Sequence, residues 1–159
     1  MSSLVIRKAD LRDAALVTAF VRELADYEKL LGEVVSTETE IKAALFCENP
    51  RVFCDLAEWD GAPAGFALWF YNFSTFRGTH AIYLEDLFVR PPFRGRGIGK
   101  ALLVNLARRA VAEGCARLDW AVLDWNAPAI AFYKSLGARA VDGWLPYRIA
   151  GDALQRLAG

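Results

Sequence analysis

The sequence predicts one α/β domain built on a mixed sheet. Its 159 residues suit a single domain over 1–159 and leave no room for two. An apolar fraction of 55% and a formal net charge of zero exclude a disordered chain. Stretches with helical periodicity are interleaved with a hairpin and with later strands. That order is typical of helices packed on a mixed sheet.

The first half of the chain is expected to form, in order, a strand over 4–8, helices over 11–31 and 38–47, strands over 51–59 and 64–71, and a loop over 72–79. Asp10 is a suitable N-cap for the first helix, and Gly32 ends it. Thr37 and Glu40 form a capping-box pattern before the second helix. The Asp60-Gly61 pair between the two later strands is a hairpin signal.

The second half is expected to form a strand over 81–89, a helix over 97–113, a strand over 117–123, a helix from 126 to 136, and two short strands or a hairpin over 139–149. Pro91-Pro92 ends the first of these strands. Asn126 caps the later helix, and Gly114 and Gly137 stop the two helices.

Composition argues against several classes of site and partner. The three cysteines are odd in number and form no C-x-x-C pair, so neither a structural disulfide nor a zinc site is expected. We therefore expect no metal and a reducing, cytoplasmic setting. The N-terminus lacks a secretory signal and no apolar run is long enough to span a membrane, so no membrane association is expected. The balanced charge gives no reason to expect nucleic acid as a partner.

The segment Arg94-Gly95-Arg96-Gly97-Ile98-Gly99-Lys100 follows an apolar strand and opens a helix. Glycines allow positive φ angles and close approach of a ligand, and helix N-terminal N–H groups favour an anion. This is the chemistry of a phosphate site, although a glycine-rich turn with solvated arginines is the alternative. The P-loop pattern fails at Ala101, which replaces the metal-binding hydroxyl, and the dinucleotide fingerprint fails at Lys100, where it requires glycine.

The pattern Arg94-x-x-Gly97-x-Gly99 resembles the pyrophosphate loop, R/Q-x-x-G-x-G/A, of the GNAT superfamily of acyl-CoA-dependent N-acetyltransferases. The segment from Asn126 to Gly137 is similar to the family's N-x-x-A/S-x-x-F-Y-x-x-x-G pattern. Across the chain the resemblance is closest to the spermidine/spermine and thialysine acetyltransferase branch. The branch marks are Val5-Ile6-Arg7, Glu23-Leu24-Ala25-x-Tyr27-Glu28, Tyr83-Leu84-Glu85-Asp86-x-Phe88-Val89, Trp125-Asn126 and Asp142-Gly143-Trp144.

This resemblance implies the GNAT fold, in which two central strands splay apart and acetyl-CoA lies in the cleft between them. The splaying strands would be 81–89 and 117–123. Main-chain N–H groups where the first strand loses its partner would bind the pantetheine and polarise the acetyl carbonyl. The residues expected at the cofactor are Leu87, Phe88, Val89, Arg94, Gly95, Arg96, Gly97, Ile98, Gly99, Lys100, Asn126 and Ala129.

Two carboxylates, Glu85 and Asp86, lie within an apolar strand. Because side chains alternate along a strand, the two are expected to face opposite sides. A buried carboxylate without a partner is costly, so both are candidates for function, with an ion pair or an edge position as the alternative. The resemblance assigns Glu85 as the base that deprotonates the amine and Tyr133 as the acid that protonates the leaving thiolate. The alternative for Tyr133 is packing on a helix face.

The residues expected to bind the amine substrate are acidic or aromatic: Tyr27, Glu28, Glu85, Asp86, Asp119 and Asp142. Tyr27 and Glu28 match the branch's amine-binding pair, and Asp142 precedes its Gly-Trp pair. Asp119 departs in residue type from the polyamine enzymes. The substrate's length and charge therefore stay open between a polyamine and a lysine analogue such as thialysine.

Three functions remain open at this point. The first is acetyl transfer from acetyl-CoA to a small primary amine. The second is the same chemistry on another amine, such as a protein lysine, a protein N-terminus or an antibiotic. The third is an acyl-CoA-binding module without catalysis, which the presence of both Glu85 and Tyr133 disfavours because a binder needs neither. The branch also implies a homodimer.

Overall fold

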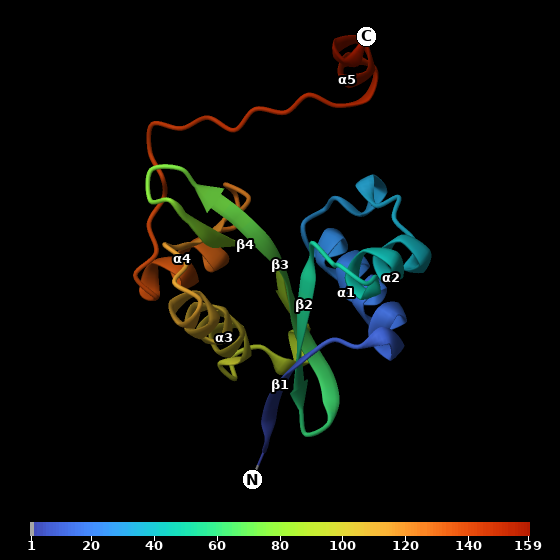
Figure 1. Ribbon diagram of the computed structural model, residues 1–159. Helices are drawn as coiled ribbons and strands as arrows, with labels where there is room; N and C mark the ends of the chain where they lie inside the picture. The colour runs from blue at the N-terminus through green and yellow to red at the C-terminus, as the bar shows by residue number, and fades with distance from the viewer. Residues whose placement is uncertain (1) are drawn as a thin grey trace. The chain divides into compact units, whose positions relative to one another are not determined.

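The computed structural model describes residues 2–159 (Figure 1). The chain divides into two compact units, Met1–Ala121 and Val122–Gly159. The first unit holds the sheet and most of the helices. The second holds two short helices and the segment between them. Each unit is described by itself.

The sheet has five strands in the order β1-β2-β3-β4-β5. The strands are β1 Leu4–Lys8, β2 Phe53–Trp59, β3 Ala62–Ser74, β4 Thr79–Val89 and β5 Leu118–Trp120. Neighbours from β1 to β4 are antiparallel, whereas β5 runs parallel to β4. The mixed sheet expected from the sequence is confirmed.

Helices cover both faces of this sheet (Figure 1). The helices of the first unit are the 3₁₀ turns η1 Leu11–Asp13, η2 Leu31–Glu33 and η3 Pro91–Phe93, and the α-helices α1 Ala14–Tyr27, α2 Glu38–Phe46 and α3 Ile98–Ala112. The helices α1 and α2 lie on one face and α3 lies on the other.

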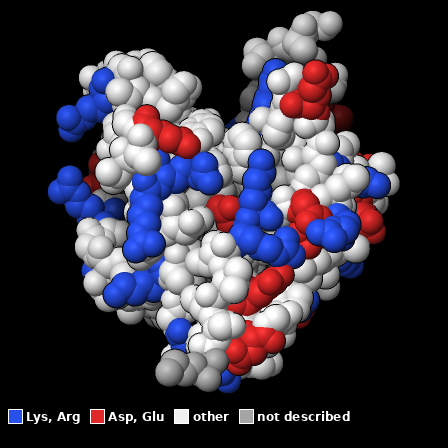
Figure 2. Space-filling model, turned by 60° about the horizontal axis from the view of Figure 1, so that its bottom comes forward, with Lys and Arg blue, Asp and Glu red and all other residues white. Residues whose placement is uncertain are grey.

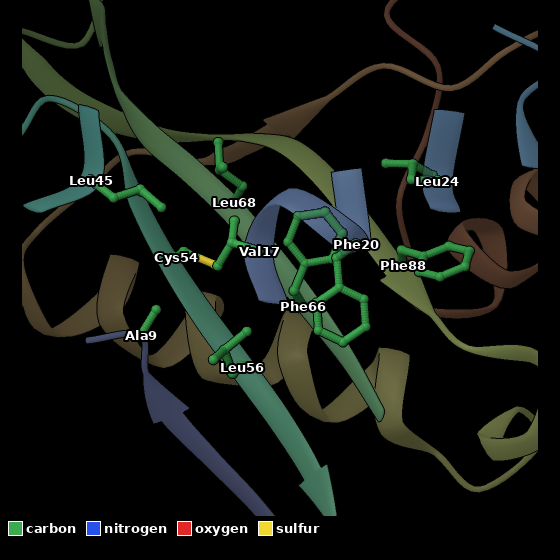
Figure 3. Close-up of a cluster of buried hydrophobic side chains, with 10 residues drawn as sticks. All are labelled: Ala9, Val17, Phe20, Leu24, Leu45, Cys54, Leu56, Phe66, Leu68 and Phe88. Carbon is green, nitrogen blue, oxygen red and sulfur yellow. The ribbon is translucent and has the colours of Figure 1, made fainter. Parts of the chain in front are cut away.

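The core on the α1 face is an apolar cluster (Figure 3). Phe20 of α1 is fully buried and stacks on Phe66 of β3, with ring centroids 5.2 Å apart. Its ring also meets the edge of Phe88 at the end of β4, at 6.5 Å. Phe66 and Leu68 share this face because they are two residues apart on β3. The cluster thus joins α1 to the strand that carries the candidate carboxylates.

The expected helix over 11–31 is shorter than predicted. Its first turn is the 3₁₀ turn η1, and α1 ends at Tyr27. The end is set by main-chain geometry, because Lys29 adopts φ 61° and the N–H of Leu30 donates to the carbonyl of Ala25 at 2.8 Å. Such a bond closes a helix C-terminus without requiring a glycine stop.

The expected loop over 72–79 was wrong for half of its length, because only residues 75–78 form the turn. Asn72 pairs with Ala81 and Ser74 with Thr79, so both strands extend into this segment. The rings of Phe73 and His80 lie 5.2 Å apart, so side-chain packing across the hairpin supports the extension. The strand expected over 117–123 is shorter than predicted and covers Leu118–Trp120.

The second unit contains α4 Ala127–Ser135 and α5 Gly151–Ala158. The two short strands or hairpin expected over 139–149 were wrong, because the described chain has no strand there, and α5 was not anticipated. A strand requires a main-chain partner, and none of the described strands pairs with residues 139–149. None of the helices in residues 2–159 has the length and apolar character needed to cross a membrane.

Candidate active site

The strands β4 and β5 diverge after a short paired stretch. Their parallel ladder covers only Ile82–Leu84 of β4, opposite Leu118–Trp120. The rest of β4, from Glu85 to Val89, extends beyond this ladder. The edge of β4 beside Leu87, Phe88 and Val89 is therefore unpaired by β5, as the sequence predicted for splayed strands.

On its other edge the same part of β4 is held tightly against β3. A Cβ added to Gly65 of β3 would lie 2.6 Å from the carbonyl oxygen of Phe88, so no larger residue fits. This role of Gly65 was not predicted from the sequence, although a glycine inside a strand pattern often signals close backbone approach. Gly65 thus helps hold the free end of β4 in place.

The loop between β4 and α3 has the backbone that a phosphate site requires. Gly95 and Gly97 adopt φ 75° and 78°, in the left-handed region. The first main-chain bond inside α3 runs from Ala101 N–H to the carbonyl of Gly97, so the N–H groups of residues 98–100 have no acceptor within the helix. An added Cβ at Gly95 or Gly97 would meet no atom within 4 Å, so space lies open beside the loop.

The two loop arginines are held by aromatic rings. Arg94 lies 5.0 Å from the ring centroid of Tyr27 and 5.5 Å from that of Phe88, and its Nε donates to the carbonyl of Val89 at 2.9 Å. Arg96 lies 5.2 Å from the ring of Trp59. Both arginines remain exposed, as does Lys100. Stacking on rings orders a guanidinium while leaving its charge available to an anion.

Besides the glycines, two of the expected cofactor residues can contribute only through their main chain. The side chains of Phe88 and Ile98 are buried, with 6% and 1% exposure. Phe88 packs in the α1 core, and Ile98 lies on the buried side of α3. Gly99 is half-buried, in the first turn of that helix.

Glu85 and Asp86 lie on the same face of the sheet, so the expectation of opposite faces was wrong. In the register of β3 and β4, Asp86 is opposite Leu68 and Leu84 is opposite Trp69. The two residues of β3 are adjacent, whereas Glu85 lies between the two of β4. Glu85 is therefore the extra residue of a β-bulge. Leu68 belongs to the core on the α1 face, and Asp86 shares that face. The bulge interrupts the alternation on which the expectation rested, so both carboxylates point to the α1 side.

The environment of Asp86 is acidic and poorly solvated. Burial, together with the nearby charges of Glu85 and Glu28, raises the pKa of Asp86 to about 7. Burial also raises the pKa of Glu28, which caps the C-terminal end of α1 beside Tyr27. The structure thus brings Glu28, Glu85 and Asp86 close to one another. A cation placed among them would be stabilised.

Asp119 lies next to this acidic group along the sheet. It is opposite Tyr83 in the β4–β5 ladder, so the two share a face. Its Oδ2 accepts hydrogen bonds from Arg117 Nε at 2.7 Å and from Asn72 Nδ2 at 3.4 Å. Neither Arg117 nor Asn72 was identified from the sequence. The Asn72 contact depends on the sheet register, whereas Arg117 is two residues before Asp119, so strand alternation could have placed both side chains on one face.

The remaining predicted residues lie in the second unit. Asn126 is buried and caps α4, its Oδ1 accepting from the N–H of Ala129 at 3.3 Å. Tyr133 lies on α4 with its ring 5.4 Å from that of Phe132. Asp142 is exposed in the irregular segment after α4. The cap gives Asn126 a structural role in α4 in addition to any contact with a cofactor.

Other kinds of site find less support in the structure. Residues 2–159 contain no group of three or more His, Cys, Asp or Glu side chains suited to a metal ion. The three cysteines are free thiols. On the face shown in Figure 2, basic and acidic side chains are interspersed, in keeping with the formal net charge of zero.

Comparisons with known proteins agree with this geometry. Residues 18–138 match the Acetyltransferase (GNAT) family. Thialysine N-epsilon-acetyltransferase of Sus scrofa is 40% identical over 170 aligned residues, covering 100% of this chain and 99% of that protein. The Caenorhabditis elegans protein of the same name is 36% identical, covering 91% of each chain. The solved structure of an integron cassette protein from the mobile metagenome of V. cholerae superposes with a TM-score of 0.81 at 33% identity, covering 98% of each chain.

This chain belongs to the GNAT acetyltransferase family, and the fold and family expected from its sequence are confirmed. As a member of that family it is an acyl-CoA-dependent N-acetyltransferase.

Proposed function

We propose that this enzyme transfers the acetyl group of acetyl-CoA to a primary amine of a small substrate, a lysine analogue of the thialysine kind or a diamine or polyamine. The observation that carries the proposal is the placement of Glu28, Glu85 and Asp86 on one face of the sheet, at the point where β4 leaves β5. Relatives that share the full length of the chain are named for thialysine acetylation.

In this proposal the coenzyme lies along the free end of β4 and the start of α3. The N–H groups of Gly95–Lys100 bind the diphosphate, and the charges of Arg94, Arg96 and Lys100 add to that attraction. The main chain of Leu87–Val89 binds the pantetheine and polarises the thioester carbonyl. Asn126 and Ala129 add contacts from the start of α4.

The chemical step is direct attack of the amine on the thioester. An alkyl ammonium with a pKa of about 10.4 is mostly protonated at neutral pH and must first lose a proton. Glu85 accepts that proton, and Asp86 helps hold the amine. The C–N bond then forms, the C–S bond breaks, and Tyr133 donates a proton to the departing thiolate. The reaction requires no metal and no covalent enzyme intermediate.

Arg117 favours a lysine analogue over a polyamine as the substrate. Tyr27, Glu28, Asp119 and Asp142 are the proposed amine-binding residues besides the pair on β4. Asp119 forms an ion pair with Arg117, so this part of the sheet carries both a negatively charged carboxylate and a positively charged guanidinium. A polyamine carries only cations, whereas thialysine also carries an α-carboxylate that a guanidinium can bind.

The proposal is tested by measuring thiol release from acetyl-CoA with thialysine, lysine, ornithine, spermidine and a lysine peptide as acceptors. We expect turnover with thialysine at least tenfold more efficient, in kcat/KM, than with spermidine. Higher efficiency with spermidine or the peptide would favour another amine. Binding of CoA by calorimetry without turnover of any amine would favour an acyl-CoA-binding module and overturn the proposal.

We also propose that the enzyme works in the cytoplasm as a homodimer. In the second unit, the segment 139–150 carries apolar side chains that the single chain leaves exposed, among them Trp144 at 75%, Leu145 at 78% and Tyr147 at 93%. Exposed apolar groups of this number usually mark an interaction surface. A second copy of the chain is the proposed partner, since it would supply main-chain neighbours for the unpaired backbone.

A further inference from the structure

A row of polar contacts joins α3 to the sheet on the face opposite α1. Asn105, Arg109 and Glu113 follow one another at intervals of four residues along α3 and its C-terminal cap, so they share one side of the helix. Each contacts a side chain from β2 or β3. We call the six residues of these contacts the α3 anchor: Asp55, Trp69, Tyr71, Asn105, Arg109 and Glu113.

The innermost contact of the α3 anchor is made by Asp55, which is 4% exposed. Its Oδ2 accepts hydrogen bonds from Trp69 Nε1 at 3.0 Å and from Asn105 Nδ2 at 3.3 Å. A buried carboxylate is costly unless it is bonded, so these two donors are required for Asp55 to be tolerated. One carboxylate thereby connects β2, β3 and α3.

The next two contacts lie successively closer to solvent. The guanidinium of Arg109 lies 5.0 Å from the ring centroid of Trp69. The hydroxyl of Tyr71 donates to Glu113 Oε2 at 2.5 Å, and Glu113 Oε1 accepts from Arg109 at 3.3 Å. The row is therefore continuous from the buried carboxylate to the C-terminal end of α3.

We expect these contacts to fix the position of α3 along the sheet more strictly than apolar packing does. Towards its N-terminus α3 presents buried apolar side chains, Ile98, Leu102 and Leu106. Apolar contact is non-directional and resists sliding of a helix weakly, whereas hydrogen bonds depend on distance and angle. A helix moves as a rigid rod, so displacement at Asn105 also displaces the N–H groups of residues 98–100.

We propose that the α3 anchor positions the N-terminal amides of α3 for the diphosphate of the acyl-CoA. The inference rests on the proposed function, because it takes these amides as the diphosphate site. Its members are positioning residues on the face of the sheet opposite the carboxylates. None of them was identified as a site residue from the sequence.

The test compares Asp55→Leu, Asp55→Asn and Tyr71→Phe by calorimetric CoA titration and by kinetics. A misplacement of about 1 Å far from the chemistry can lower a reaction rate by up to about 100-fold. We expect the displaced amides in Asp55→Leu to weaken CoA binding by less, about tenfold. Asp55→Asn retains an acceptor oxygen and should restore affinity to within about threefold. Tyr71→Phe removes only one exposed hydrogen bond, so we expect this variant to fold. It should weaken CoA binding about threefold. The KM for acetyl-CoA should rise in parallel, with the KM for the amine unchanged.

Val17→Ala is the matched control, because it removes buried volume from the core on the α1 face. Even where Val17→Ala lowers thermal stability as much as an anchor variant does, Val17→Ala should leave CoA affinity unchanged. The inference is overturned if Val17→Ala weakens CoA binding as much as the anchor variants, or if Asp55→Leu and Tyr71→Phe bind CoA like the wild type. A wild-type protein that binds no CoA would overturn the proposed function itself, and the inference with it.

Discussion

Asp86 is a carboxylate whose surroundings disfavour its ionised form. It is half-buried, and the two neighbours that act on it, Glu85 and Glu28, are acidic. Its pKa of about 7 in the folded protein lies above the ordinary value of 3.8. Between these values the folded state binds more protons than the unfolded state, so this group's contribution to stability falls as the pH rises from about 4 to 7.

Asp86→Asn is therefore expected to stabilise the protein at high pH. At pH 8 its free energy of unfolding in urea should exceed that of the wild type by about 1–3 kcal/mol. At pH 5 the gain should be smaller, because the wild-type carboxyl group is then mostly protonated. Asp142→Asn, which changes an exposed carboxylate of the second unit, is the control substitution. Equal or lower stability of Asp86→Asn at pH 8 would contradict the raised pKa.

Glu85→Gln tests the proposed base. Because general-base catalysis contributes at least about 100-fold, kcat/KM at pH 7 should fall by about that factor. The deficit should narrow toward pH 10, where free amine becomes abundant. Glu48→Gln, at an exposed position remote in sequence, is the control. A loss that stays constant across the pH range would mean that Glu85 positions the substrate instead of accepting its proton.

Tyr133→Phe tests the proposed acid. Loss of the hydroxyl should lower kcat by about 100-fold while CoA affinity, measured by calorimetry, stays within about twofold. Tyr147→Phe removes the hydroxyl of an exposed tyrosine in the same unit and should retain the wild-type rate. An unchanged kcat in Tyr133→Phe would remove this residue from the mechanism.

At the scale of elements, the start of α3 depends on one backbone conformation. Gly97 is the N-cap of the helix, adopts φ 78° and has no side chain to satisfy the first N–H groups. A residue with a side chain in this left-handed region costs about 1–2 kcal/mol. If the backbone at position 97 relaxed to avoid that cost, the N–H groups of residues 98–100 would turn away from their common direction.

Gly97→Ala should accordingly weaken CoA binding by about tenfold and lower stability by about 1 kcal/mol. Calorimetry and urea unfolding give the two quantities. Gly32→Ala is a matched control, since Gly32 has no positive φ and an added Cβ there meets no atom within 4 Å. Equal CoA affinity in wild type and Gly97→Ala would exclude the loop as the diphosphate site.

At the scale of the whole molecule, the exposed apolar segment after α4 predicts self-association. Light scattering after size exclusion should give a mass twice 17.6 kDa. Leu145→Asp should shift the protein toward the monomer, because a charge cannot be buried in an apolar interface without cost. Val111→Asp places the same charge on an exposed apolar position of α3 and should stay dimeric. A monomeric wild type would contradict the homodimer.

Much of the fold could be predicted from local pattern. The strands β2 and β3, the Asp60-Gly61 turn between them and the capping box at Thr37 were all confirmed. These features are determined by residues close together in the chain. The predictions over 72–79 and 139–149 failed because strand formation depends on a partner strand.

The sequence by itself determined the family, the glycine loop before α3 and the residue types of the candidate site. Only the tertiary structure decided that Glu85 and Asp86 share a face, that Asn72 is bonded to Asp119, and that Asp55 links two strands to α3. The physical reason is that local motifs depend on spacing along one chain segment. A bulge, or a hydrogen bond between side chains of different elements, depends on the register and packing of neighbouring elements.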